Sequence, residues 1–225
     1  VAYTLKDSYM FVLGEPVGDR KYFGNLILSL SNYANANGMH LVFTQIGEHL
    51  AMDLLDYDFN ILKIGEEAVI NLNEFSLEGA AGKDFRYLLR RFEKLGYSIP
   101  YYKKIHDHDV ITELSEISDM WLKDGHQERK FTTSSFSEVY LTGKDVHVLR
   151  DNQNKPLAFI SLIYYGKKCV ALDFMRKRSK ILNGSMEVLL ITAMAEAKEL
   201  GLKKFNLQLA ALSGMDSAEK ITEKT

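Results

Sequence analysis

The chain has 225 residues, 46% of them apolar and 26% charged, which is typical of a folded globular protein and excludes wholesale disorder. Its 28 Lys and Arg against 30 Asp and Glu give a net charge of −2, which excludes a protein that coats nucleic acid through overall positive charge. The single cysteine, Cys169, excludes an internal disulfide and a metal site built on several cysteines, and it favours a cytoplasmic setting.

The sequence contains no run of apolar residues near the roughly 18 that cross a bilayer, so no membrane span is expected. The first residues, Val-Ala-Tyr-Thr-Leu-Lys, lack the apolar stretch of a signal peptide. Because the chain does not begin with Met, we expect a fragment of a longer protein, whose membrane anchor would lie outside this sequence.

The first segment has the pattern of a strand, a turn, a helix and a strand. Apolar residues recur at helical spacing in the helix, which Asn37 and Gly38 end. These four elements are expected at 9–13, 14–19, 22–36 and 39–46, followed by a helix at 48–55 and extended segments at 60–64 and 67–72.

Residues 170–209 repeat this order. A strand, a polar and basic loop, a helix ended by Gly201 and a second strand are expected at 170–174, 176–184, 185–200 and 205–209. The repeat predicts a structural duplication, although two unrelated strand–helix–strand units would give the same pattern.

Between the two units we expect helices and a hairpin. The helices are at 85–96 and 109–122, and the hairpin joins strands at 146–150 and 157–165 through the turn residues 151–154. Gly96, Pro100 and a polar run place the boundary near 97–108, so the predicted domains are 1–100 and 101–225.

The clearest local signal is a basic helix that follows Gly82. Seven basic and two acidic residues between positions 83 and 104 give a local balance of +5. Such a stripe can follow a phosphate backbone, or it can simply be a solvated helix face. Its basic side chains are those of Lys83, Arg86, Arg90, Arg91 and Lys94, opposite an apolar face of Phe85, Leu88, Leu89, Phe92 and Leu95.

The second signal is a strand that delivers Asp173 and Arg176 into a basic loop before a helix. Backbone N–H groups at a helix start attract anions, so a polar substrate is plausible here. Asp173 could orient or deprotonate a hydroxyl, and Arg176 could hold a phosphate or an oxyanion. A structural Asp–Arg pair beside a basic loop is the alternative.

Other features of the sequence give weaker indications of a functional site. His106-Asp107-His108 has no third metal ligand at a sensible spacing, so a solvated loop is expected. Cys169 and Trp121 are expected in the core. The nucleophile elbow, the Walker A motif and the zinc-protease motif are absent from the sequence.

The chain resembles the cytosolic C-terminal region of bacterial phosphatidylglycerol lysyltransferases, also called aminoacyl-phosphatidylglycerol synthases. The stretches that carry the resemblance span almost the whole chain in family order. They are LGEPVGD (13–19), KIGEEAVINLNEFSLEGAAGKDFRYLLRRFEKLGY (63–97), LSEISDMWL (114–122), ALDFMRKR (171–178), NGSMEVLL (183–190) and KKFNLQLAALSG (203–214).

The resemblance implies an α/β (α+β) fold of tandem GNAT-like domains, each a mixed central sheet with flanking helices. It implies an enzyme that transfers a lysyl or alanyl group from aminoacyl-tRNA to a glycerol hydroxyl of phosphatidylglycerol, which protects against cationic antimicrobial peptides. No cofactor is then needed, because aminoacyl-tRNA is the donor. The site is expected at the cytoplasmic face of the bacterial membrane, with a transmembrane domain in the parent chain.

The matching positions imply site residues. Asp173 and Arg176 would be catalytic, the basic helix would contact tRNA, and a third group would bind the acceptor. That group is Arg178, Asn183, Gly184 and Glu187.

The chain departs from the wider fold family in two ways. Residues 178–184 lack the pyrophosphate loop of enzymes that use coenzyme A, which argues against acetyl-CoA as donor. Family members continue past the last stretch, so we expect a second domain truncated at its C-terminus and a partial first domain. The remaining alternatives are an aminoacyl-tRNA-dependent transferase with a peptide or other soluble acceptor, and a non-catalytic module that binds tRNA or membranes.

Overall fold

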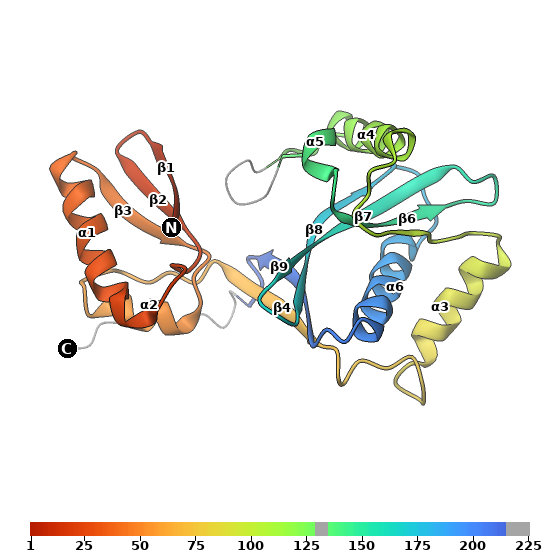
Figure 1. Ribbon diagram of the computed structural model, residues 1–225, viewed down its shortest axis with the longest axis horizontal. Helices are drawn as coiled ribbons and strands as arrows, with labels where there is room; N and C mark the ends of the chain where they lie inside the picture. Colours follow the sequence, from red (N-terminus) through yellow and green to blue (C-terminus); the bar gives the residue numbers. More distant parts are fainter. Residues whose placement is uncertain (129–134, 215–225) are drawn as a thin grey trace. The chain divides into compact units, whose positions relative to one another are not determined.

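A computed structural model describes residues 1–128 and 135–214 of the chain (Figure 1). The contacts divide the described residues into two compact units, one of residues 1–66 with 209–214, and one within residues 67–208. Each unit holds a mixed sheet with flanking helices, so the predicted α/β class is confirmed. Within the described ranges, the helices lack the length and hydrophobicity of a membrane-spanning segment.

The first unit is built on a three-stranded sheet in the order β1-β2-β3. β1 and β2 form an antiparallel hairpin, and α1 then crosses over to the parallel strand β3. Met10 and Val12 of β2 are buried against Ala34 of α1, which gives the unit its core. The elements are β1 (Ala2–Lys6), β2 (Tyr9–Leu13), a 3-10 turn η1 (Arg20–Tyr22), α1 (Phe23–Ala36), β3 (His40–Thr44) and α2 (Glu48–Leu55).

The second unit is built on a six-stranded sheet in the order β4-β9-β8-β7-β6-β5. Strands β5 to β8 pair antiparallel, whereas β9 pairs parallel with β8. The strands are β4 (Gly65–Asn71), β5 (Tyr101–Tyr102), β6 (Asp145–Arg150), β7 (Pro156–Tyr165), β8 (Cys169–Lys177) and β9 (Lys204–Ala211). The helices are α3 (Lys83–Lys94), α4 (His108–Lys123), α5 (Glu138–Leu141) and α6 (Ser185–Glu199).

Helices cover both faces of this sheet. Alternate residues of β7 separate two cores, because successive side chains of a strand point to opposite faces. Ile160 packs with α3 and α6 on one face, whereas Phe159 packs with α4 and α5 on the other. Figure 1 shows the two pairs of helices on opposite sides of β6, β7 and β8.

The predicted repeat of elements is present in the structure. In each unit an antiparallel hairpin is followed by a helix and a parallel strand: β1-β2-α1-β3 in the first and β7-β8-α6-β9 in the second. The predicted strands and helices of both repeats lie within a few residues of their observed positions.

The unit boundary differs from the one expected from the sequence. It falls between Glu66 and Glu67, whereas the sequence analysis placed a domain boundary at 100/101. The reason is packing: Leu88 and Phe92 of α3 lie in the same core as α6, so the basic helix belongs to the second unit. Residues 129–134 and 215–225, inside the predicted second domain, lie outside the described residues.

Three local expectations need correction. The strand β1 was not expected, because its residues are mostly exposed and show no clear alternation. The segment 60–64 forms no strand. β8 continues to Lys177, so Arg176 lies in a strand and not in the loop that the sequence indicated.

Candidate functional site

A β-bulge in β8 organises the residues around Asp173. Ile160 pairs with Met175 and Leu162 pairs with Leu172, so Asp173 and Phe174 together oppose a single residue of β7, Ser161. An extra residue in one strand reverses the alternation of side chains beyond it. Asp173 and Arg176 are three residues apart and would otherwise lie on opposite faces, but the bulge brings both to the face covered by α4 and α5.

Ser161 completes the bulge with its hydroxyl. Its Oγ accepts a hydrogen bond of 3.1 Å from the backbone N–H of Phe174, a donor that the bulge removes from the ladder. The same oxygen lies 3.4 Å from Oδ2 of Asp173 and donates to it. Ser161 is fully buried, so the hydroxyl satisfies groups that water does not reach. Ser161 is not among the site residues expected from the sequence, where its signal is a lone hydroxyl in the apolar run 157–163.

The Asp173 carboxylate is half-buried between two strands and a short helix. Besides Ser161, the phenol of Tyr140 in α5 donates to its Oδ1 at 3.3 Å. The Tyr140 ring packs edge-on against Phe174, which holds the phenol in place. These contacts fix the direction of the carboxylate, which is what a group that orients a substrate hydroxyl requires.

Arg176 is enclosed by residues of its own chain, although its buried Nε has no hydrogen-bond partner among the described residues. It is 5% exposed, its Nη2 lies 3.0 Å from Oε1 of Glu128, and its guanidinium carbon lies 3.7 Å from the centre of the Trp121 ring. Burial lowers the pKa of Arg176, and the Glu128 charge opposes this effect. The alternative of a structural pair therefore describes Arg176 better than an open phosphate site, with Glu128 and not Asp173 as the partner. An anion that took the place of Glu128 at Nη2 would do so in exchange for this ion pair.

The four residues expected to bind the acceptor lie in two separate places. Arg178 is tied to α4 and to the sheet: its Nε donates to the carbonyl of Pro156 at 2.8 Å, and its Nη2 lies 3.7 Å from Glu116. The other three residues lie at the start of α6, whose core is on the opposite face of the sheet. They are Asn183, Gly184 and Glu187, of which Asn183 and Glu187 are exposed.

Gly184 has a structural reason to be glycine. It caps α6 with a φ of +93°, in the left-handed region. A Cβ at this position would lie 2.7 Å from Cδ1 of Leu88 in α3. Close packing of α3 on α6 therefore accounts for Gly184 without a ligand.

Five basic residues of α3 were expected to contact tRNA, and three of them are exposed to solvent. Arg86 donates to the carbonyls of Leu77 and Gly79, and Arg91 donates to the carbonyl of Asn183 at 3.4 Å. These two guanidinium groups anchor the helix to neighbouring loops. Lys83, Arg90 and Lys94 are exposed. Leu95, expected on the buried face, is 47% exposed because the helix ends beside it.

The strands β8 and β9 part beside Asp173. They pair only from Cys169 to Ala171 on β8 and from Lys204 to Asn206 on β9. Beyond this point the side chain of Gln208 donates to the carbonyl of Leu172 at 2.9 Å, where a ladder bond would otherwise lie. The edge of β8 that carries Asp173 is therefore not paired with β9.

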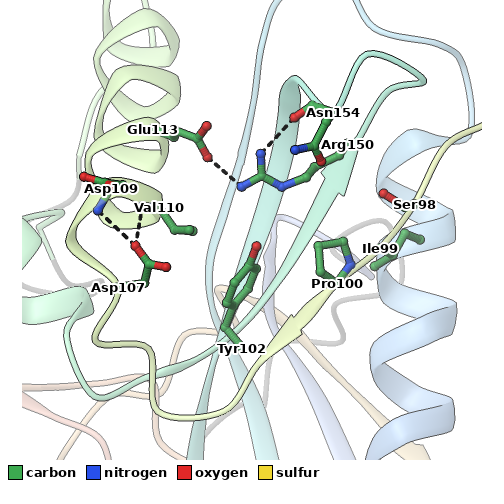
Figure 2. A pocket seen from close by; sticks show the side chains of 10 residues that line it. All are labelled: Ser98, Ile99, Pro100, Tyr102, Asp107, Asp109, Val110, Glu113, Arg150 and Asn154. Atoms are coloured by element: carbon green, nitrogen blue, oxygen red, sulfur yellow. Dashed lines mark hydrogen bonds and ion pairs between the residues drawn. The ribbon is translucent and has the colours of Figure 1, made fainter.

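A cavity of about 620 Å³ lies away from Asp173, where α4 begins and β6 ends (Figure 2). Figure 2 shows Arg150 between Glu113 and the turn residue Asn154. Arg150 is buried, and it donates to Oε2 of Glu113 at 2.5 Å and to the carbonyl of Asn154 at 2.9 Å. Asp107 caps α4 by accepting from the N–H of Asp109 and Val110. His106 and His108, on either side of Asp107, are exposed. Arg150, Glu113 and Asp107 of this cavity are thus occupied by partners within the chain.

A buried polar cluster lies at the start of β6. Oδ2 of Asp145 accepts from the phenols of Tyr101 at 2.6 Å and Tyr164 at 2.5 Å, and its Oδ1 accepts from the N–H of Lys104 at 2.8 Å. Burial raises the pKa of Asp145, but the three hydrogen bonds and the charge of Lys103 outweigh this effect, so the pKa lies below its ordinary value. Burial, with Asp145 beside it, raises the pKa of Tyr101 to about 12. Neither group is suited to exchange a proton near neutral pH.

Comparison with known proteins supports one family. The family described as phosphatidylglycerol lysyltransferase, C-terminal, matches residues 1–225. A phosphatidylglycerol lysyltransferase of Staphylococcus aureus strain MRSA252 is 32% identical over 214 residues, which are 95% of this chain and 25% of that protein. A relative of the same name from Staphylococcus epidermidis is 30% identical and covers 96% of this chain. The chain spans about a quarter of the length of these curated relatives.

Solved structures agree with this result. L-PGS from Bacillus licheniformis superimposes with a TM-score of 0.85 and 28% identity, covering 98% of this chain and 68% of that one. The C-terminal domain of a putative lysylphosphatidylglycerol synthetase from Agrobacterium fabrum gives 0.87 and 29%, covering 96% and 69%. FemX, at 0.60 and 12% identity over 98% of this chain and 76% of that one, shares the fold alone. Because the family match covers its whole length, this chain belongs to the family of phosphatidylglycerol lysyltransferase C-terminal regions.

Proposed function

We propose that this chain is the aminoacyl-transferring part of a larger protein that modifies phosphatidylglycerol. The observation that carries the proposal is the family match over residues 1–225, together with relatives named phosphatidylglycerol lysyltransferase. The aminoacyl group would be lysyl or alanyl and would come from aminoacyl-tRNA. The modified lipid gains positive charge, so it would attract cationic antimicrobial peptides less.

The chemistry is an exchange of one ester for another. The oxygen of a glycerol hydroxyl bonds to the ester carbonyl carbon of the aminoacyl group, and the bond from that carbon to the tRNA ribose oxygen breaks. The hydroxyl proton passes to the ribose oxygen, so atoms and charge balance. The donor is already activated, and the protein has mainly to position two reactants. We therefore propose no cofactor.

Asp173 is the residue we assign to the hydroxyl. Its carboxylate is fixed by Ser161 and Tyr140 and lies on the strand edge that β9 has left. We assign Arg176 to an anion, a lipid phosphate or the developing oxyanion, in a state where Glu128 has released it. Lys83, Arg90 and Lys94, the exposed cations of α3, are the side chains we assign to tRNA.

We place the transfer at the cytoplasmic face of the bacterial membrane, where aminoacyl-tRNA and phosphatidylglycerol meet. The parent chain would carry a transmembrane domain, in keeping with relatives about four times longer than this chain.

The test is a transfer assay with the full-length protein that carries this chain. Lysyl-tRNA and alanyl-tRNA compete for phosphatidylglycerol in vesicles, and mass spectrometry identifies the lipid product. An aminoacylated phosphatidylglycerol is expected. A product only on peptide or soluble acceptors, or salt-dependent tRNA binding without transfer, would contradict the proposal and support the other two functions considered from the sequence.

The residue assignment has its own test. Asp173→Asn keeps the shape of the side chain and removes its charge, so transfer should fall about a hundredfold or more. Asp119→Asn, an exposed carboxylate of α4, is the matched control and should leave the rate unchanged. Wild-type transfer by Asp173→Asn would refute the role of Asp173.

A further inference from the structure

Three short segments of the second unit have a similar composition, and none of them contributes a residue to the proposed site. Residues 101–104 are Tyr-Tyr-Lys-Lys, residues 164–168 are Tyr-Tyr-Gly-Lys-Lys, and residues 200–204 are Leu-Gly-Leu-Lys-Lys. Together they contain six lysines and no Asp or Glu. Each therefore places an apolar or aromatic pair next to a pair of positive charges.

The sheet brings the three segments to the same end. Tyr165 pairs with Cys169, which pairs with Lys204, and the N–H of Lys203 donates to the carbonyl of Lys168 at 2.8 Å. A shallow cavity of about 460 Å³ is lined by residues of all three segments, among them Lys103, Tyr164 and Leu200. We call this end the lysine surface; it comprises Lys103, Lys104, Lys167, Lys168, Lys203 and Lys204 with Tyr164, Tyr165 and Leu200.

Most of the charge of the lysine surface is not neutralised, although Lys103 is attracted by the buried Asp145 carboxylate. All six lysines are exposed, and none forms an ion pair with a residue in the described part of the chain. The Asp145 carboxylate beneath them is buried and occupied by Tyr101, Tyr164 and the N–H of Lys104. Glu196 and Glu199 in the last turn of α6 are the acidic neighbours in sequence, too few to balance six cations.

Apolar side chains are exposed between these charges. Tyr164 is 47% exposed, Tyr165 43% and Leu200 49%. Amphipathic tyrosines and an aliphatic side chain among lysines suit the boundary between phospholipid headgroups and acyl chains. The six cations are all lysine, whereas binding sites for nucleic acid favour the bidentate fork of arginine. On this chain the exposed arginine Arg90 lies on α3 instead, whereas Arg91 of the same helix donates to the carbonyl of Asn183.

We propose that the lysine surface docks this chain onto a bilayer rich in anionic phospholipid. The inference rests on the proposed function, because a transferase that acts on phosphatidylglycerol must meet its substrate at such a bilayer. The lysines supply attraction to the headgroup phosphates, and Tyr164, Tyr165 and Leu200 supply apolar contact with the interface. We assign tRNA binding to α3 and not to this surface.

The direct test is flotation of the 225-residue chain with vesicles. Binding is expected to vesicles of equal parts phosphatidylglycerol and phosphatidylcholine, not to phosphatidylcholine alone, and should weaken as salt rises. Each lysine at a membrane surface contributes roughly fivefold in partitioning, so Lys203→Gln with Lys204→Gln should weaken binding about 25-fold. Lys203→Arg with Lys204→Arg should keep it.

The matched control removes the same charge elsewhere. Lys123 and Lys155 are exposed, at the end of α4 and in the β6–β7 turn, and their change to Gln should leave vesicle binding unaltered. Equal loss in the control, or wild-type binding by the Lys203 and Lys204 variant, would overturn the proposal. A parallel loss of tRNA affinity in that variant would do so too, because it would assign the surface to nucleic acid.

Transfer to two forms of the lipid separates this proposal from the proposed function. In the full-length protein, the Lys203 and Lys204 variant should transfer normally to dispersed short-chain phosphatidylglycerol and poorly to vesicles. Equal loss on both lipids would overturn docking as the role of the surface. If the wild type transferred to neither, the proposed function would fail, while the flotation result would still decide the docking.

Discussion

His147 is a buried titratable residue that the proposed mechanism does not use. Its ring is 1% exposed, stacks on Tyr101 at 4.8 Å, and has no hydrogen-bond partner for either nitrogen among the described residues. Burial lowers its pKa to about 4, and the nearby Asp145 charge opposes this only in part. The folded protein therefore holds His147 neutral in a range where the unfolded chain would protonate it.

This predicts a pH dependence of stability. Between pH 6.5 and about 4 the unfolded state binds a proton that the folded state does not, so stability falls as pH falls through this window. The loss attributable to His147 between pH 7 and pH 4 should be about 3 kcal/mol. Urea unfolding at both pH values should show this loss of unfolding free energy in the wild type. In His147→Phe the loss between the two pH values should be smaller by the same amount. Asp145 titrates below this window and does not confound the comparison, because its pKa is lowered. An equal pH dependence in both proteins would contradict the prediction.

The pair of Arg176 and Glu128 gives a second prediction at the residue scale. Their side chains are 6% and 13% exposed, so each charge depends on the other for solvation. Glu128→Gln leaves a buried cation and should cost about 3 kcal/mol of unfolding free energy. The double variant Arg176→Met with Glu128→Gln removes both charges and should be more stable than Glu128→Gln alone.

Denaturation of the two single variants and the double variant completes this cycle. Arg176 also stacks on Trp121, so Trp fluorescence gives a readout at the site itself. A Glu128→Gln variant as stable as the wild type, or a double variant less stable than either single one, would show that the pair does not hold Arg176.

At the scale of elements, the bulge in β8 separates what the sequence could predict from what it could not. The run 171–178 was sufficient to choose Asp173 and Arg176, because polar residues interrupt an apolar strand there. That both side chains share a face follows from the register with Ser161 in β7. A register between strands depends on contacts that no local pattern contains, so the bulge and its supporting hydroxyl appear only in the structure.

The amphipathic helices were the most predictable elements. Phe85, Leu88 and Phe92 recur at helical spacing, and all three pack in the core shared with α6. Arg86 and Arg91 carry the same pattern as their exposed neighbours, yet the structure uses them to bind loop carbonyls. The partners of these two arginines come from other segments, so charge alone could not distinguish them from free surface cations.

The contact of α3 with α6 predicts an unusual cost at Gly184. Gly184→Ala places a methyl group 2.7 Å from Leu88 on a backbone with φ of +93°. Gly201 has φ of +77° but open space around it, so Gly201→Ala reports the backbone strain alone. We expect about 1 kcal/mol for Gly201→Ala and about 1–3 kcal/mol more for Gly184→Ala, because overpacking adds to the strain.

Thermal or urea unfolding of these variants measures the difference. Adding Leu88→Ala to Gly184→Ala should recover part of the packing cost, since the shorter side chain leaves room for the methyl group. Equal destabilisation at the two glycines would show that α3 does not press on the start of α6.

At the scale of the whole molecule, the order of elements was predictable and the grouping into units was not. The repeat at 9–46 and 170–209 was readable because each copy is local in sequence. The unit boundary depends on where α3 packs, and a helix between two repeats can join either one. Its apolar face proved to complete the core over α6, so the segment 83–94 belongs with residues 67–208.

This grouping predicts which fragments fold. The fragment 67–208 retains most of β4, all of α3 and the whole core around α6, so it should unfold cooperatively in urea and keep the pH dependence of His147. The fragment 101–208 follows the boundary expected from the sequence and lacks α3 and β4. It exposes the apolar side of α6 that Leu88 and Phe92 cover, and it leaves β9 as an unprotected edge strand.

Circular dichroism and urea titration of both fragments, with His147→Phe in the longer one, decide the matter. We expect a single steep transition for 67–208, and for 101–208 a broad transition or aggregation. A difference between wild type and His147→Phe confined to the interval from pH 6.5 to about 4 would show that the longer fragment has its native core. The same midpoint and steepness in both fragments would instead mean that α3 contributes nothing to the second unit, which would return the boundary to residue 100.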